Sequence, residues 1–130
     1  MGTKTFLVVD DSATMRQLIT LTLKRMKGCE VVEAADGTEA AARLRSETFD
    51  LVITDIKMPQ MDGLQLVRHI RQDLKLQDLP VVVITTKGED GDRDAGLQAG
   101  ANAYLTKPLS GPMLIQLIES LFQEKSPVTS

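Results

Sequence analysis

The residues of this sequence that could carry chemistry each stand directly after a short apolar run. Four such runs occur, at Phe6–Val9, Leu51–Thr54, Val81–Ile84 and Ala103–Thr106. The residues that follow them are Asp10 and Asp11, Asp55, Thr85, and Lys107. Runs of this kind are typical of strands buried on both faces of a parallel sheet. Because ligands bind where the carboxyl ends of such strands meet, we expect three carboxylates, one hydroxyl and one ammonium group in one small cleft.

This set of side chains suits phosphoryl transfer. Three carboxylates that lie close together repel one another, so protons or a cation must relieve the site. A divalent ion with oxygen ligands, of which Mg²⁺ is the leading candidate, would leave one carboxylate oxygen free to act as a nucleophile. Lys107 would supply a positive charge, and Thr85 a hydroxyl donor, to the transferred group. Each residue alone also has a structural explanation, such as helix capping by an aspartate. Their coincidence at four strand ends favours a function.

Strand and helix patterns alternate along the chain, which predicts an α/β fold with a parallel sheet. The predicted strands are the four runs above, of which the run at Val81–Ile84 is extended to Pro80–Thr85, and a further segment at Cys29–Glu33. Ser12 can cap a first helix, and Asp36 with Glu39 has the spacing of a capping box for a second. Apolar stripes at helical spacing lie within 15–26, 41–44, 66–74 and 114–122. Pro59 and Gly63 predict a loop over Lys57–Gly63.

Two helical segments carry further expectations. The predicted helix Arg93–Ala99 has Leu97 as its only large apolar residue, so we expect it to be the most weakly anchored element. Arg68, His69 and Arg71 are expected on the solvated face of the third helix. No repeat or linker separates a second domain, so residues 1–130 are predicted to form one domain. Its core covers about 4–124, and a polar tail follows at 125–130.

Composition excludes several classes of protein. The net charge of −3 provides no basic field for nucleic acid. Cys29 is the only cysteine, so the chain has no intramolecular disulfide and no cysteine–histidine set for zinc. No apolar run has the length needed to span a membrane, and the N-terminus lacks the core of a signal peptide. We therefore expect a cytoplasmic protein that binds neither nucleic acid nor membrane.

Short motifs occur in order along nearly the whole chain: Val-Asp-Asp-Ser at 9–12, Asp55, Met-Pro at 58–59, Asp-Gly at 62–63, Thr85, and Lys-Pro at 107–108. In type and spacing they resemble those of a two-component response-regulator receiver domain, of the stand-alone chemotaxis type. The resemblance implies a flavodoxin-like (βα)5 three-layer sandwich with a five-stranded parallel sheet in the order 2-1-3-4-5. It also implies a signalling switch that catalyses only its own phosphorylation and dephosphorylation, rather than an enzyme with a separate substrate.

The resemblance further implies a role for each site residue. Asp55 is the phosphoacceptor, and Thr85 and Lys107 bind the phosphoryl oxygens. The implied ligands of Mg²⁺ are Asp10 (largely through water), Asp11, Asp55 and the backbone carbonyl of Lys57. The donor is a phosphohistidine on a sensor histidine kinase or on a phosphotransfer protein.

Four further positions bear on signal lifetime and output. Lys57 and Lys87 stand two residues after Asp55 and Thr85, and we hypothesise that a cation there alters hydrolysis of the acyl phosphate. Thr86 is bulkier than the small residue often found at its position, which would narrow access to the site. In the family, an aromatic residue at the position of Tyr104 swings inward as the threonine moves. The alternative is a half-buried tyrosine that keeps one rotamer.

The output is expected through a partner-binding face formed by the Arg93–Ala99 helix, the last strand and the last helix. The partner could be a flagellar switch or the next protein of a relay, or the chain could act as a phosphate sink.

Two functions from other classes fit the residues less well. Small Mg²⁺-dependent phosphohydrolases that use an aspartyl phosphate carry a second acid two residues after the nucleophile, where this chain has Lys57. They also need a cap or substrate pocket, for which the chain has no length. A flavin-binding flavodoxin would need a hydroxyl- and glycine-rich loop after the first strand, where Asp10 and Asp11 stand, and more aromatic residues than three Phe and one Tyr.

Overall fold

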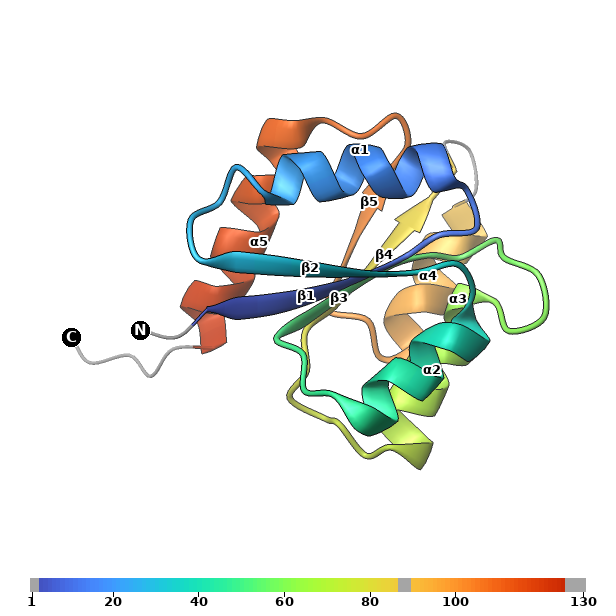
Figure 1. The fold of residues 1–130 in the computed structure, drawn as a ribbon. Helices are drawn as coiled ribbons and strands as arrows, with labels where there is room; N and C mark the ends of the chain where they lie inside the picture. The colour runs from blue at the N-terminus through green and yellow to red at the C-terminus, as the bar shows by residue number, and fades with distance from the viewer. Residues whose placement is uncertain (1–2, 87–89, 126–130) are drawn as a thin grey trace.

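Five parallel strands form a single sheet at the centre of the molecule (Figure 1). The structure is a computed structural model that describes residues 3–86 and 90–125. The strands are β1 (Lys4–Val9), β2 (Cys29–Ala34), β3 (Leu51–Asp55), β4 (Val81–Thr85) and β5 (Ala103–Thr106). They pair in the order β2-β1-β3-β4-β5, and each neighbouring pair is parallel. The predicted strand order is confirmed, and the carboxyl ends of all five strands lie along one edge.

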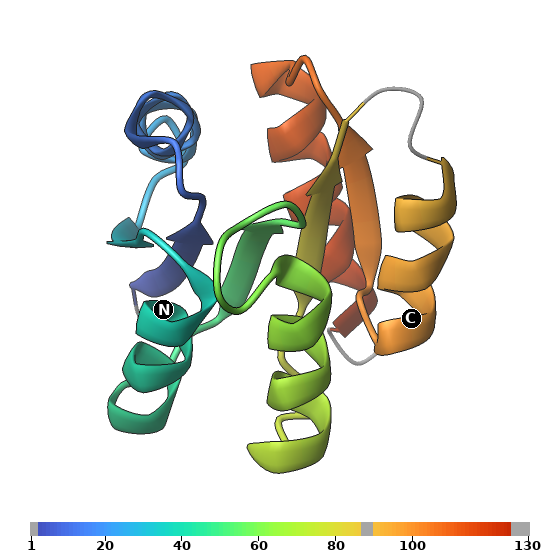
Figure 2. The same ribbon diagram turned by 90° about the vertical axis from the view of Figure 1, so that its right-hand side faces the viewer.

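Helices cover both faces of the sheet, which confirms the three-layer sandwich (Figure 2). One face carries α1 (Ala13–Leu23) and α5 (Gly111–Lys125). The other carries α2 (Gly37–Ser46), α3 (Gly63–Arg68) and α4 (Asp90–Ala99). Among the residues that the structure describes, no helix combines the length and the apolar character that crossing a membrane would require.

The apolar runs of the sequence fill two separate cores. In β1, Leu7 and Val9 face α2, α3 and α4, whereas Phe6 and Val8 face α1 and α5. All four side chains are fully buried. Burial on both faces explains why the strands appear as continuous rather than alternating apolar runs. Each such side chain contributes about 2 kcal/mol to stability, so the strand ends that carry the polar residues are held in a rigid frame.

The bounds of several elements differ slightly from those predicted. β2 continues to Ala34, β4 begins at Val81 rather than Pro80, and α4 begins at Asp90 rather than Arg93. The last helix extends through Lys125, one residue into the predicted tail. The rest of that tail, residues 126–130, lies outside the described residues. Helix ends are the least certain part of a sequence pattern, because capping and tertiary contacts set them.

The third helix changes its geometry halfway along. After α3, residues His69–Asp73 form a π-helical segment (η1), in which the Leu74 N–H donates to the His69 carbonyl at 2.9 Å. The His69 ring contacts the Asp73 carboxylate at 2.7 Å, so His69 is partnered rather than simply solvated.

The expectation that Arg71 lies on a solvated face is wrong. Its side chain is buried and donates to the carbonyls of Leu76, Leu79 and Gly100 at 2.6, 2.7 and 3.0 Å, and to the Asn102 side chain at 2.9 Å. Burial lowers the pKa of the guanidinium. Since these acceptors precede β4 and β5, Arg71 joins the two loops that lead into the last two strands. A guanidinium can do this because it presents several donors in a fixed plane.

Helix α4 lies on the sheet through its small residues. Gly96 is buried, and a Cβ atom built on it would lie 2.9 Å from a methyl group of Val83 in β4. Leu97, the only large apolar residue of the segment, is 40% exposed. The helix therefore approaches the sheet closely but buries little apolar surface, which supports the expectation of weak anchoring.

Candidate functional site

Asp10 is the buried centre of the acidic site. It follows β1 directly, and its side chain is fully buried. One carboxylate oxygen, Oδ1, accepts the Ser12 N–H at 2.9 Å, while the buried Oδ2 has no hydrogen-bond partner. Burial raises the pKa of Asp10, and the charges of Asp55 and Asp11 raise it further, against the lowering effect of the Ser12 N–H and Lys107. A buried oxygen without a partner is costly, so this carboxylate fits a cation or a proton.

The carboxylates of Asp10, Asp11 and Asp55 meet at the carboxyl edge of the sheet. One oxygen atom from each lies within 4.8 Å of the other two. Adjacency of β1 and β3 produces this convergence, because the two strands pair in parallel and end side by side. Asp55 is almost fully buried and Asp11 is exposed, so the cluster opens to solvent on the side of Asp11. Oxygen donors in this arrangement fit a hard divalent cation such as Mg²⁺.

Lys107 brings a positive charge to the same cluster from the far side of the sheet. Its Nζ lies 3.1 Å from Oδ2 of Asp55. The Lys107 backbone N–H donates to the Thr85 carbonyl at 2.8 Å, which ties the residue to the end of β4. The Lys107–Pro108 peptide bond is cis. The Lys107 ammonium group therefore lies against the Asp55 carboxylate, which is the less exposed side chain of this ion pair.

The loop after β3 folds back tightly onto Asp55. The Gly63 N–H donates to the Ile56 carbonyl at 2.8 Å. A Cβ atom on Gly63 would lie 2.7 Å from the Cα of Ile56 and would collide with the Asp55 carbonyl, so only glycine fits there. Asp62 and Gln65 form a reciprocal capping box that starts α3. The predicted loop at 57–63 therefore serves to return the chain to the site.

A hollow of about 370 Å³ lies beside the acidic cluster. It is lined by Asp11 and by residues of the β3–α3 loop and the start of α3: Ile56, Lys57, Met58, Pro59, Asp62 and Leu64. The Lys57 side chain is exposed at this hollow. The Lys57 position thus borders the cluster, as the sequence led us to expect, whereas Lys87 falls outside the described residues.

Thr85 and Tyr104 lie on the neighbouring strands. Thr85 ends β4, is buried, and its hydroxyl donates to the Leu105 carbonyl at 3.5 Å, a long hydrogen bond toward β5. Thr86 is exposed. Tyr104 is paired in register with Val83, is half-buried, and its hydroxyl accepts from Arg93 Nη1 at 3.2 Å. The Arg93 guanidinium also lies 5.2 Å from the centre of the Tyr104 ring, so α4 and β5 are joined by a cation–π contact.

The sequence did not predict a group of residues that holds the backbone carbonyl of Asp10. Arg16 on α1 donates Nη1 to the backbone carbonyl of Asp10 at 2.6 Å and pairs through Nε with Glu33 on β2 at 3.1 Å. Thr20 donates its hydroxyl to the second Glu33 oxygen at 3.2 Å. A sequence signal existed: Arg16 follows the Ser12 cap by four residues, which places it one turn into α1 and near the end of β1.

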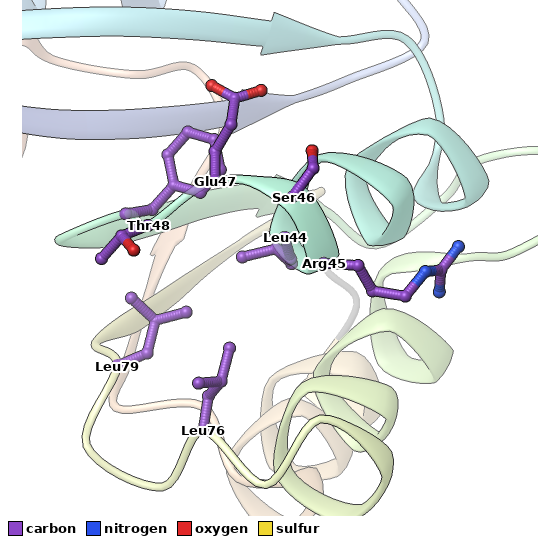
Figure 3. A pocket seen from close by; sticks show the side chains of 8 residues that line it. Leu44, Arg45, Ser46, Glu47, Thr48, Leu76 and Leu79 are labelled. Atoms are coloured by element: carbon purple, nitrogen blue, oxygen red, sulfur yellow. The ribbon is translucent and has the colours of Figure 1, made fainter.

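A second hollow, of about 250 Å³, lies away from these residues (Figure 3). It is formed by the end of α2, the segment before β3 and the segment before β4, through Leu44, Phe49, Leu76 and Leu79 among others. These segments precede the amino ends of β3 and β4, so this hollow is at the opposite edge from the carboxylates. It takes no part in the acidic site.

Fold and site together define a flavodoxin-like α/β protein with a carboxylate cluster and a lysine at the carboxyl edge of its sheet. Residues 6–119 of this chain match the family model of the response regulator receiver domain. The chain is 40% identical over 116 residues to a chemotaxis protein CheY homolog of Campylobacter jejuni, which covers 88% of this chain and 89% of the relative. It is 38% identical over 117 residues to the chemotaxis protein CheY of Pseudomonas aeruginosa, with 90% and 94% covered.

Solved structures agree with these relatives. The chemotaxis protein CheY4 of Vibrio cholerae superimposes with a TM-score of 0.84 at 32% identity, over 92% of this chain and 99% of that one. The chain belongs to the response regulator receiver family. Members of this family are signalling switches of two-component and chemotaxis systems rather than conventional enzymes. Membership of the family therefore argues against the phosphohydrolase and the flavin-binding flavodoxin considered above.

Proposed function

We propose that the protein accepts a phosphoryl group on Asp55 in an Mg²⁺-dependent reaction. The observation that carries this proposal is the 3.1 Å contact between Lys107 Nζ and Asp55 Oδ2, made beside the buried Asp10 oxygen that has no partner. A nucleophilic carboxylate needs neighbouring positive charge to approach an anionic phosphoryl donor. The acidic cluster alone would repel such a donor, and Lys107 offsets part of that repulsion.

The chemistry needs no general base. A carboxylate oxygen of Asp55 forms a bond to phosphorus while the N–P bond of a phosphohistidine breaks. The electron pair of that bond stays on the imidazole nitrogen, which is then free to take a proton from water. Lys107 neutralises charge on the phosphoryl oxygens, and Thr85 can turn its hydroxyl from the Leu105 carbonyl toward them, because its present hydrogen bond is long.

The divalent cation would be held by Asp10, Asp11, Asp55 and the backbone carbonyl of Lys57. When bound, Mg²⁺ supplies positive charge that offsets carboxylate repulsion and stabilises the charge that develops on the phosphoryl oxygens. The chain's own residues fix where that charge acts. Asp10 is held by the Ser12 N–H, and Asp55 by the rigid end of β3.

The output surface would be the face formed by α4, β5 and α5. A new dianionic group at Asp55 can draw Thr85 toward it and free space next to Tyr104, the residue that links β5 to α4 through Arg93. The weakly anchored α4 can respond to this change at low cost. The donor would be a sensor histidine kinase or a phosphotransfer protein in the cytoplasm. The receiving partner would be a protein such as a flagellar switch.

Lys57 is proposed to tune the lifetime of the phosphoryl group, since it borders the hollow beside Asp11. A cation there would alter the access of water to the acyl phosphate. Half-lives of the phosphorylated protein in Lys57→Asn and Lys87→Ala, compared with the unchanged chain, would show whether either lysine acts. Equal half-lives in all three proteins would reject this role.

Intact mass spectrometry tests the central proposal. Incubation with Mg²⁺ and acetyl phosphate should add the mass of one phosphoryl group to the protein. The addition should be absent in Asp55→Asn and after chelation of the cation. Asp50→Asn is the matched control, because Asp50 lies before β3 at the other edge of the sheet. If Asp55→Asn gains the same mass as the unchanged protein, Asp55 is not the acceptor.

A further inference from the structure

The backbone of Asp10 is held by groups that are not part of the acidic cluster. The Asp10 N–H donates to the Ala34 carbonyl at 3.2 Å, and the Asp10 carbonyl accepts from Arg16 Nη1 at 2.6 Å. Both polar atoms of the Asp10 backbone are therefore fixed by groups outside the site. Because a peptide unit is planar, fixing the Asp10 carbonyl also fixes the amide of Asp11 and the Asp11 Cα atom, the point from which the Asp11 side chain leaves the backbone.

Arg16 is itself held in place by a second layer of contacts. Its Nε contacts Glu33 Oε1 at 3.1 Å, and the other oxygen of Glu33 accepts from Thr20 at 3.2 Å. The Arg16 side chain is only 18% exposed, so the pair is partly shielded from solvent. Three elements meet here, since Arg16 and Thr20 lie on α1, Glu33 on β2, and the Asp10 carbonyl at the end of β1.

The geometry needs a guanidinium rather than any cation. Arg16 uses Nε for Glu33 and Nη1 for the Asp10 carbonyl, which are two separate donors of one rigid plane. A lysine ammonium at this position would keep the charge, but as a point donor on a flexible stem it cannot hold both acceptors in this fixed relation. The planar group therefore fixes the Asp10–Asp11 peptide relative to Glu33 on β2.

We propose that Arg16, oriented by Glu33, is a positioning residue for the divalent-cation site. It holds the Asp10–Asp11 peptide so that both carboxylates converge with that of Asp55. Partners that orient metal ligands in this way commonly change affinity by a factor of about 10 to 100 when they are removed. This inference rests on the proposed function, because it assumes that the acidic cluster binds a divalent cation.

A role of Arg16 through its charge and a role through positioning predict opposite changes in cation affinity when Arg16 is replaced. The direction of the change therefore distinguishes the two roles. As a nearby positive charge, Arg16 opposes cation binding, so its loss would tighten binding if charge alone mattered. As a positioning group, its loss would weaken binding. Arg16→Met removes the charge and keeps an unbranched stem, whereas Arg16→Lys keeps the charge and removes the planar pair of donors.

The experiment is a titration of the full chain with Mn²⁺, which takes the same oxygen ligands as Mg²⁺. The free ion is counted by its electron paramagnetic resonance signal, which is lost on binding. We expect both Arg16→Met and Arg16→Lys to bind Mn²⁺ about 10-fold more weakly than the unchanged protein. Arg43→Met is the matched control, because Arg43 forms an exposed ion pair with Glu47 on α2, away from the site, and should leave affinity unchanged.

Unchanged affinity in Arg16→Lys would overturn the inference, and so would tighter binding in Arg16→Met. Circular dichroism and thermal unfolding of each variant without metal show that the comparison is made between folded proteins. If Arg16→Met does not fold, Arg16→Lys decides alone. Asp11→Asn gives the reference for a damaged site. An unchanged protein that binds no Mn²⁺ would overturn the proposed function together with the inference, whereas normal binding with an unaffected Arg16→Lys would overturn the inference only.

Discussion

Lys107 Nζ lies 3.1 Å from Asp55 Oδ2, although 52 residues separate the two in the chain. The contact spans the sheet from the loop after β5 to the end of β3, with β4 between them. It places the cation of the site directly against the carboxylate proposed as nucleophile. Because the Asp55 side chain is only 6% exposed, solvent screens this pair less than it would a surface ion pair.

Replacing Lys107 should change the rate of phosphorylation and the affinity for the divalent cation in opposite directions. We expect Lys107→Met to slow phosphorylation by acetyl phosphate by roughly 100-fold, the usual scale for loss of one group that stabilises developing charge. The same variant should bind Mn²⁺ more tightly, because a competing positive charge has gone. Initial rates by intact mass and a Mn²⁺ titration measure the two effects. Lys27→Met, at an exposed turn after α1, is the control. A normal rate in Lys107→Met would exclude the proposed role.

The raised pKa of Asp10 should make stability depend on pH. Burial, followed by the charges of Asp55 and Asp11, lifts this pKa above its ordinary value of 3.8. Between that value and the folded-state pKa, the folded protein binds more protons than the unfolded chain, so stability falls as pH rises. The loss is complete above the folded-state pKa and absent below 3.8.

Asp10→Asn should therefore be more stable than the unchanged protein at neutral pH without divalent cations. The difference should vanish below pH 3.8. Urea unfolding at the two pH values measures this difference, with Glu30→Gln, at an exposed position of β2, as the control. Added Mg²⁺ should stabilise the unchanged protein more than Asp10→Asn, because it binds the folded state of the intact site. A variant that is less stable at neutral pH would contradict the conclusion that burial and the neighbouring carboxylates destabilise the ionised form of Asp10.

Tyr104 provides a single optical reporter of the link between β5 and α4. The sequence has one tyrosine and no tryptophan, so intrinsic fluorescence comes from Tyr104 apart from the weak phenylalanine signal. Arg93→Gln removes the guanidinium over the ring. We expect stronger quenching of Tyr104 by acrylamide and a loss of about 0.5 kcal/mol in stability, as for an exposed cation–π contact. Gln98→Met, also exposed on α4, should change neither. Identical quenching in Arg93→Gln would show that the contact does not restrain the ring.

Two glycines test whether the β3–α3 loop must close on Asp55. At Gly63 a Cβ atom would press against backbone of Asp55 and Ile56, whereas at Gly91 nothing lies within 4 Å. Gly63→Ala should lower the free energy of unfolding by about 2 kcal/mol and weaken Mn²⁺ binding. Gly91→Ala should raise stability by about 0.5 kcal/mol, because alanine favours a helix. Chemical denaturation gives both values, and a neutral Gly63→Ala would mean that the loop can retreat without cost.

The order of elements and the acidic edge were predictable because both follow from local patterns. Continuous apolar runs such as Val81–Ile84 occur where a strand is covered on both faces, and the residue after the run must then stand at the carboxyl edge. That rule places Asp10 and Asp55 at the same edge of the sheet without knowledge of any side-chain contact. The strand order itself came from resemblance, since apolar runs do not state which strands are neighbours.

Arg71, Arg16 and Arg93 show where such patterns fail. All three are charged residues on predicted helices, and by composition alone each belongs on a solvated surface. In the folded protein one is buried against backbone carbonyls, one holds the Asp10 carbonyl, and one lies over the Tyr104 ring. Each of these partners lies outside the helix that carries the arginine, so the residue pattern of that helix alone does not identify it.

The sequence by itself determined which segments are strands and helices, and that three carboxylates and a lysine stand at strand ends. Those features depend on periodicity and chain direction, which are properties of short segments. Only the tertiary structure decided that Asp10 keeps a buried oxygen without a partner, that Gly63 touches the Asp55 backbone, and that Arg16 joins β2 to the Asp10 carbonyl. These relations depend on the packing of several elements at once, and a long side chain can reach any of several acceptors until that packing is fixed.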